Sequence, residues 1–237
     1  MILRSLARRL YRFPGPTLNT ASNQNLGRFA RLLIEELPPD ATPIVLNVGG
    51  GNRSLPTSHV PKTISNNTHF LDIRQTAMST IIADALSLPL ADSSYRGVIS
   101  LAMLEHVSDS ERAVAEMHRV LRSGALIYCE VPFIQVFHAA PYDYRRFTSA
   151  GLATLFRDFE LIEIGVCAGP SSALSWIARS YLAGLLSCFS SNRRARQIAD
   201  FIAAWITFPI KYLDLVVANR PAAPEMASAL FFLGRKA

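Results

Sequence analysis

Hydrophobic positions along the chain follow two patterns: short unbroken runs, and longer stretches with helical spacing. Helical spacing is seen over residues 24–37, between 108 and 121, and from about Thr148 onward. The short runs have the length of buried strands and lie at 43–48, 69–73, 79–84, 97–102, 125–132, 159–166 and 229–236. Strands that alternate with helices predict an α/β fold, with a mostly parallel seven-stranded sheet and helices on both of its faces.

The helix between the fourth and fifth strands has the clearest end signals. Ser108 and Glu111 form a capping-box pattern, and Gly124 follows the last apolar position. We therefore expect this helix to begin beside Ser108 and to stop before Gly124.

Residues 168–227 interrupt the alternation with two helix-like segments that are apolar around most of their circumference. Neither has the roughly 20 uninterrupted apolar residues of a membrane span, because Arg179 breaks the first and Pro209, Lys211 and Asp214 break the second. Such helices suit a lid, a dimer face, or a patch that contacts a membrane or receives a lipid-like substrate. The predicted domains are a basic segment with a helix over 1–42, an α/β domain over 43–167 and 228–237, and a helical insert over 168–227.

Composition and charge narrow the class of protein. The 237 residues are 50% hydrophobic, which indicates a packed core, and the net charge of +6 is spread along the chain. No long basic run is interleaved with aromatic residues, so the charge disfavours nucleic acid as a partner. The stretch MILRSLARRLYRFPGP is basic. We interpret it as an amphipathic lead-in on a cytoplasmic protein, with organelle targeting or a membrane-surface helix as alternatives.

The cysteines and histidines give no sign of a metal site. Cys129, Cys167 and Cys188 lie far apart and form no CxxC pair, and the five histidines are equally scattered. We expect reduced thiols and no bound metal.

Glycines and acids mark the ends of the first three predicted strands. Gly49–Gly51 follows the first strand, Asp72 ends the second, and Asp84 ends the third. Ligands of open parallel sheets bind at the carboxyl ends of the strands, where a carboxylate can accept both hydroxyls of a ribose. The glycines alone do not identify the ligand, but Pro56 and Pro61 oppose the long helix of a dinucleotide site.

The chain resembles the class I S-adenosylmethionine-dependent methyltransferases (type 11) over VLNVGGGN…FLDI…ADALSLPLADSSYRGVISLAMLEHV…EMHRVLRSGALIYCEVP. The resemblance covers residues 43–166 and the last strand. It implies a Rossmann-like fold and S-adenosyl-L-methionine as the cofactor. It also implies a set of cofactor-binding residues at the strand ends: Asn47, Gly49, Gly50, Gly51, Asp72, Ile73, Asp84, Ala85, Leu101 and Glu105. By this resemblance Asp72 holds the ribose hydroxyls, while Asp84 and the Ala85 backbone hold the adenine.

Two departures from the family pattern affect the expected cofactor site. Asn47 stands where the family has an acid. It offers an amide oxygen to the cofactor's ammonium but no charge, so we expect weaker binding of that end. Residues 52–62 lack the helix that the family has after its glycines.

A second polar cluster follows the fifth strand in HAAPYDYRRFTSAGL, residues 138–152. It resembles a segment in a subset of bacterial methyltransferases, some of which look related to glycan or lipid modification. His138 or Asp143 could take a proton from an acceptor hydroxyl, and His106 in the LEHV stretch is a third catalytic candidate. A structural interpretation pairs Asp143 with an arginine and makes Thr148 a helix cap. The candidate acceptor-binding residues are Tyr142, Tyr144, Arg145 and Arg146.

The predicted function is in-line transfer of a methyl group from S-adenosylmethionine to a small, lipid-like or glycan-linked acceptor. The alternatives are a non-catalytic binding module with the same fold and a nucleic-acid methyltransferase. A cytoplasmic protein with peripheral membrane contact is expected. The sequence does not identify the acceptor or the oligomeric state.

Overall fold

The computed structural model describes residues 15–37, 42, 44–51, 55–56, 58–138, 141–188, 190 and 192–237. These residues divide into two compact units. The sheet unit comprises Thr20–Phe133, Phe137–Cys167 and Leu230–Ala237. The helical unit comprises the described part of Met1–Asn19 together with Ile134–Val136 and Ala168–Ala229.

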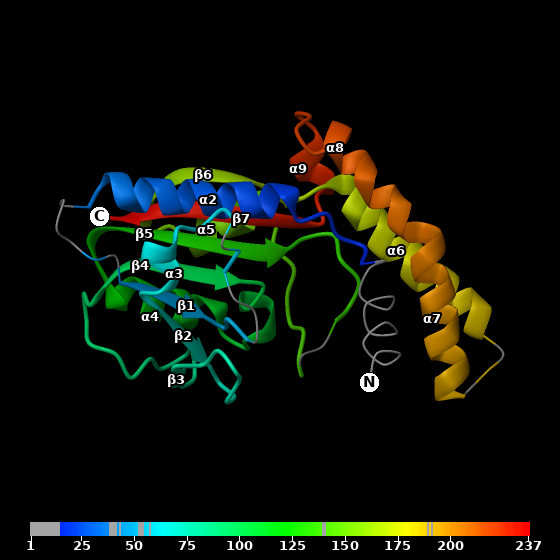
Figure 1. Ribbon diagram of the computed structural model, residues 1–237, viewed down its shortest axis with the longest axis horizontal. Coiled ribbons are helices and arrows are strands. Elements are labelled where there is room, and N and C mark those ends of the chain that lie inside the picture. The colour runs from blue at the N-terminus through cyan, green and yellow to red at the C-terminus, as the bar shows by residue number, and fades with distance from the viewer. Residues whose placement is uncertain are drawn as a thin grey trace. The chain divides into compact units, whose positions relative to one another are not determined.

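One sheet forms the centre of the sheet unit, and seven strands of the described chain build it (Figure 1). Their order across the sheet is β3-β2-β1-β4-β5-β7-β6. β1 pairs in parallel with β2 and β4, and parallel pairing continues outward to β3 and β5. β7 runs opposite to β5 (Figure 1). The predicted mostly parallel seven-stranded sheet is confirmed. Its strands are β1 Val45–Val48, β2 Thr68–Asp72, β3 Ile81–Ile82, β4 Tyr95–Leu101, β5 Leu121–Pro132, β6 Phe159–Ala168 and β7 Ala229–Lys236.

Helices pack on both faces of this sheet because alternate strand residues point to opposite sides. Leu46 and Val48 of β1 lie in one buried cluster with residues of α4 (Ser110–Val120) and α5 (Ser149–Leu155). On the other face, Phe29 of α2 (Thr20–Glu35) contacts Tyr128 of β5, with ring centroids 6.0 Å apart. Two shorter elements, α3 (Lys62–Ser65) and η1 (Leu104–His106), complete the sheet unit.

The ends of α4 differ from the sequence prediction. Asp109 caps the helix and its Oδ1 accepts a hydrogen bond from the Arg112 amide at 2.9 Å, so the expected cap at Ser108 is wrong. An aspartate caps as well as a serine, and here it lies one residue closer to the helix. α4 ends at Val120, directly before β5, and Gly124 lies inside β5 with φ of 75°. There the pairing of β5 with β4 is irregular.

The helical unit is built on α6 (Pro170–Ser187) and α7 (Arg193–Thr207), which pack together and continue into η2 (Phe208–Leu213), α8 (Asp214–Val217) and α9 (Ala223–Met226). The charged residues that interrupt its apolar segments make contacts within the unit. Arg179 donates to both oxygens of Asp200, at 2.8 and 2.6 Å. Asp214, 5% exposed, accepts from the amides of Ser171 and Ser172 at the start of α6. Among the described residues, no helix combines the length and apolarity needed to cross a membrane.

The observed units differ from the predicted domains on their N-terminal side. α2 belongs to the sheet unit because its apolar face covers the sheet, whereas residues 15–19 belong to the helical unit. Within that unit the Trp176 indole donates to Thr17 Oγ1 at 2.7 Å, and Gln135 Nε2 donates to Ser228 Oγ at 3.1 Å.

Candidate active site

The glycine turn after β1 lies at the carboxyl edge of the parallel strands, where such sheets bind ligands. The Gly49 amide donates to the Leu71 carbonyl of β2 at 2.8 Å. Gly49 has φ of 74°, and a Cβ there would lie 2.3 Å from Met103 Cγ, so this position needs glycine. Gly51 has φ of 54°, and a Cβ there would meet nothing within 4 Å. Met103 therefore packs closely against the turn at Gly49, whereas the space beside Gly51 is free of atoms from the other described residues.

Asp72 holds this turn from the neighbouring strand. Its Oδ2 accepts from the Gly51 amide and its Oδ1 from the Arg74 amide, both at 3.0 Å. A carboxylate oxygen has two lone pairs, so each oxygen can accept one further hydrogen bond. Asp72 thus both shapes the turn and retains the capacity to accept two hydroxyls.

Exposed apolar side chains and a second carboxylate lie near Asp72, at the carboxyl ends of β2 and β3. The side chains of Ile73 and Ile82 are 65% and 58% exposed, as is expected of groups that cover a flat ring. Asp84 is exposed, its Oδ1 accepts from the Leu86 amide at 2.9 Å, and Ala85 beside it is buried. Leu101 is half-buried at the end of β4.

Asn47 lies beneath the turn instead of on its surface. The residue is 1% exposed, and a Cβ at Gly50 would lie 2.9 Å from its Nδ2. Gly50 therefore needs to be glycine because the Asn47 side chain packs under it. Its Oδ1 has no hydrogen-bond partner among the described residues. Direct contact with a ligand at the edge would need this side chain to reach the surface, so we assign it to supporting the turn.

These residues fit S-adenosylmethionine, which the sequence resemblance implies. Asp72 offers acceptors for ribose hydroxyls, and the exposed isoleucines offer a surface for the adenine ring. Gly51 leaves open space at the turn. When bound, the cofactor supplies a methyl group activated by a sulfonium sulfur.

A second set of side chains gathers where η1 follows β4. Glu105 is fully buried, and the Nε2 atoms of His106 and His138 each lie 3.7 Å from its Oε1. The two imidazole rings meet edge to face, with centroids 5.4 Å apart. Their side chains are 18% and 29% exposed, so both remain accessible to a ligand. The sequence prediction assigned Glu105 to the cofactor; the structure places its carboxylate beside the two catalytic candidates.

The loop after β5 is tied to η1 by backbone hydrogen bonds. The Tyr144 amide donates to the Glu105 carbonyl at 2.7 Å, and the Nδ1 atom of His106 lies 2.6 Å from the Tyr142 carbonyl. A carbonyl only accepts, so Nδ1 of His106 carries the proton of this bond. The exposed Tyr142 and Tyr144 rings pair with centroids 5.6 Å apart. Both rings are accessible to a ligand.

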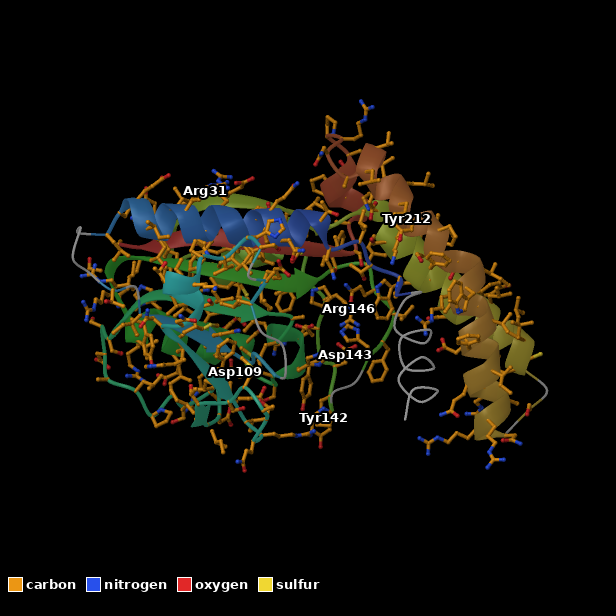
Figure 2. All side chains as sticks on the ribbon, in the orientation of Figure 1. Arg31, Asp109, Tyr142, Asp143, Arg146 and Tyr212 are labelled. Carbon is orange, nitrogen blue, oxygen red and sulfur yellow. The ribbon has the colours of Figure 1, made fainter. Side chains whose placement is uncertain are left out.

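Asp143 and Arg146 form an ion pair in the same loop (Figure 2). The Asp143 side chain is 1% exposed. Its Oδ2 accepts from Arg146 Nη2 at 2.6 Å and from the His138 amide at 2.8 Å, and Oδ1 accepts from Arg146 Nη1. The guanidinium, together with the His138 amide, holds the pKa of the Asp143 carboxyl well below its ordinary value, although burial opposes this. Such a carboxylate is a weak proton acceptor, so its geometry favours positioning His138 and Arg146.

The structural roles that the sequence left open are also present. Arg145 donates to Ser110 Oγ at 2.8 Å and to the Ser108 carbonyl at 2.6 Å, which anchors the loop to the start of α4. Thr148 caps α5 by accepting from the Gly151 amide. The two neighbouring arginines therefore have different partners.

Comparison with known proteins identifies the domain that carries this edge. Residues 50–129 match the family model described as a methyltransferase domain. Three solved structures resemble the chain. The [4+2]-cyclase SpnF is 17% identical with a TM-score of 0.53, and the match covers 89% of this chain and 81% of that one. The carbon methyltransferase CurJ is 12% identical with a TM-score of 0.54, over 91% and 54% of the two chains. Phosphoethanolamine N-methyltransferase 2 from Haemonchus contortus, in complex with S-adenosyl-L-methionine, is 14% identical with a TM-score of 0.51, over 88% and 52%.

Identities of this size show a shared fold, and the cyclase shows that the fold carries more than one chemistry. The matched domain is named for methyl transfer, and it contains Gly50, Gly51, Asp72, Asp84 and Glu105. Residues 50–129 therefore carry a methyltransferase domain, and the sheet of the described chain agrees with the α/β fold of the similar structures.

Proposed function

We propose that this enzyme methylates a hydroxyl group of a small, lipid-like or glycan-linked acceptor. One observation carries the proposal: two partly exposed imidazoles, His106 and His138, share a fully buried carboxylate, Glu105. Amines and thiolates need little help to attack a sulfonium methyl group, whereas a hydroxyl needs a group that takes its proton. A histidine pair at the edge of the cofactor site serves that purpose.

His106 is the better placed proton acceptor of the pair. Its Nδ1 proton is held by the Tyr142 carbonyl at 2.6 Å, so Nε2 presents a lone pair when the ring is neutral. After the acceptor's proton moves to Nε2, the Glu105 carboxylate 3.7 Å away stabilises the charged ring. The bound cofactor would supply the activated methyl group, and the role of His106 and Glu105 is to accept the acceptor's proton and to hold the resulting charge beside it.

The loop after β5 supplies the acceptor-binding surface in this proposal. Tyr142 and Tyr144 are 61% and 49% exposed, and paired phenol rings suit the apolar face of a sugar or an isoprenoid-like chain. Asp143 and Arg146 fix the loop behind them. Arg145 is already bound to the start of α4, so we assign it to anchoring the loop and not to the acceptor.

The helical unit supports a lipid-like acceptor or a membrane surface. Ile198, Ile202 and Ile206 recur every four residues on α7, and each is at least 44% exposed. α6 carries a comparable exposed set. Arg193, Arg194 and Arg196 are exposed at the start of α7 and would attract anionic headgroups.

The acceptor proposal is tested by mixing the purified protein with isotopically methyl-labelled S-adenosylmethionine and matched hydroxyl acceptors: a sugar glycoside, a lipid-linked sugar and a polyprenol. Label transfer to an oxygen, abolished in His106→Ala and retained in the exposed His59→Ala control, is the expected result. Transfer to nitrogen or sulfur, or full activity of His106→Ala, contradicts it.

Membrane contact is tested separately by flotation with vesicles of neutral and anionic lipid. We expect the protein to float with anionic vesicles and Ile198→Ser/Ile202→Ser/Ile206→Ser to remain in solution. Leu161→Ser is the control, because it removes a similarly exposed apolar residue, 52% exposed, from β6. Equal flotation of the triple variant and the control refutes the contact.

A non-catalytic binding module is the alternative, and it is favoured by the absence of a charge at Asn47. That alternative predicts cofactor binding without turnover on any acceptor. A nucleic-acid acceptor, in contrast, predicts RNA or DNA affinity that falls steeply with salt.

A further inference from the structure

Glu105 is a carboxylate in an unfavourable position. The residue is 0% exposed, and neither of its oxygens has a hydrogen-bond partner among the described residues. Removing an ionised carboxylate from water without a partner is strongly unfavourable. A positive charge close to this side chain would offset that cost.

Two imidazole nitrogens face the same oxygen of this carboxylate. Nε2 of His106 and Nε2 of His138 each lie 3.7 Å from Glu105 Oε1, which is too long for a hydrogen bond. One ligand atom from each of the three residues lies within 4.8 Å of the other two. Two ligand atoms bound to one ion at about 2.1 Å lie about 3.0–3.4 Å apart, so each pair at 3.7 Å needs to close by only a few tenths of an ångström.

The outer nitrogen of His106 has the kind of partner that metal-bound histidines use, and a carboxylate lies near the outer nitrogen of His138. Nδ1 of His106 lies 2.6 Å from the Tyr142 carbonyl, which directs the Nε2 lone pair toward Glu105. Nδ1 of His138 lies 3.9 Å from Asp143 Oδ2 and 3.5 Å from Arg146 Nη2. Arg146 only donates, so metal binding through Nε2 would require Nδ1 of His138 to carry a proton and to approach Asp143 Oδ2 from 3.9 Å before donating to it. Carbonyl and carboxylate partners of this kind orient metal-ligating imidazoles and set their tautomer.

The formal charges also favour a cation. Glu105 and Asp143 are negative and Arg146 is positive, so with neutral imidazoles the cluster carries one net negative charge. Asp143 is paired with Arg146 in this count, which leaves the Glu105 charge to be neutralised. Two imidazoles and one carboxylate suit divalent transition metals better than magnesium or calcium, which prefer oxygen ligands.

We propose that Glu105, His106 and His138 bind one divalent transition-metal ion. Three protein ligands leave coordination positions open, and an acceptor oxygen can occupy one of them. This role rests on the proposed function. A bound ion takes the place of the free His106 imidazole as the group that receives the acceptor's oxygen and promotes loss of its proton. The sequence did not indicate this site because a loop brings His138 to a histidine far from it along the chain.

The full-length protein, treated with a chelator and dialysed, is titrated with Co²⁺ and followed by visible absorption, and with Zn²⁺ by calorimetry. We expect one equivalent of each metal to bind. Glu105→Gln, His106→Ala and His138→Ala should each weaken binding by at least about 10- to 100-fold, the loss typical of removing a residue that only supports a metal ligand. The control is His59→Ala, an exposed histidine hydrogen-bonded to Ser58, which should bind metal like the wild type.

Several outcomes would overturn the site. The absence of Co²⁺ absorption from the wild-type protein at one equivalent of metal would refute the site, and this result does not depend on the folding of any variant. Equal affinities for the wild type and a folded His138→Ala protein would also overturn it. Methylation activity is measured separately on the metal-free protein, after calorimetry has shown that it still binds S-adenosylmethionine. If the metal-free protein still methylates a hydroxyl, the proposed function stands and the catalytic role of the metal is refuted. If the protein binds metal but methylates no hydroxyl, the metal site stands and the proposed function is refuted.

Discussion

Replacing Asp72 with asparagine tests the candidate cofactor site through the carboxylate proposed to bind the ribose. The carboxylate accepts one backbone amide on each oxygen, from Gly51 and from Arg74, both at 3.0 Å. Asparagine has the same shape but only one accepting oxygen, so its Nδ2 would face one of these amides, donor against donor. The substitution therefore removes the charge and disturbs the turn without creating a cavity.

The size of the effect follows from the hydrogen bonds lost. A hydrogen bond to a charged group contributes about 1.5–3 kcal/mol. Loss of one ribose bond and weakening of the other should then reduce the binding free energy of S-adenosylmethionine by about 2–3 kcal/mol. At 1.4 kcal/mol per factor of ten, Kd should rise about 30- to 150-fold.

Isothermal titration calorimetry with S-adenosylmethionine measures this change directly, and thermal unfolding shows whether the variant is folded. Asp92→Asn is the matched control, because Asp92 has a side chain 75% exposed and pairs with Arg119 away from the strand ends. We expect its Kd to equal that of the wild type. An Asp72→Asn protein that is folded and binds within about threefold of wild type would refute the ribose-binding role.

Two further predictions concern buried charges. Asp214→Asn should lower the free energy of unfolding by about 2–4 kcal/mol, because one amide oxygen replaces a carboxylate that accepts from Ser171 and Ser172. Denaturant unfolding measures this change, with the exposed Glu225→Gln variant as the control. Equal stability of the two variants would contradict the prediction. The pKa of Asp143 is lowered in the folded state from an ordinary 3.8, chiefly by Arg146, so its stabilising contribution is complete above that value and is lost as the pH falls below it. Stability measured from neutral pH to about pH 3 should therefore fall more steeply for wild type than for Asp143→Asn, and parallel curves would show that the pair contributes nothing.

The sequence by itself determined the architecture and indicated the candidate cofactor site. Runs of buried residues and helical spacing predicted all the strands of the sheet, because strand and helix periods are local properties of the chain. Gly49–Gly51 and Asp72 could be located because parallel strands bring their carboxyl ends to one edge. The helix cap at Ser108 was misplaced because Asp109, one residue later, caps equally well.

Contacts between segments distant in the sequence were decided by the tertiary structure alone. Arg145 and Arg146 are indistinguishable by pattern, yet one anchors the loop to Ser108 and Ser110 and the other holds Asp143. Asp214 was predicted only to interrupt an apolar segment, but folding places it at the start of α6, where its charge stabilises the free amides. The pairing of His106 with His138 around Glu105 likewise needed the loop after β5 to fold back onto η1. Contacts between side chains that are distant in the sequence depend on the tertiary fold, and the local hydrophobic periodicity of the sequence carries no information about them.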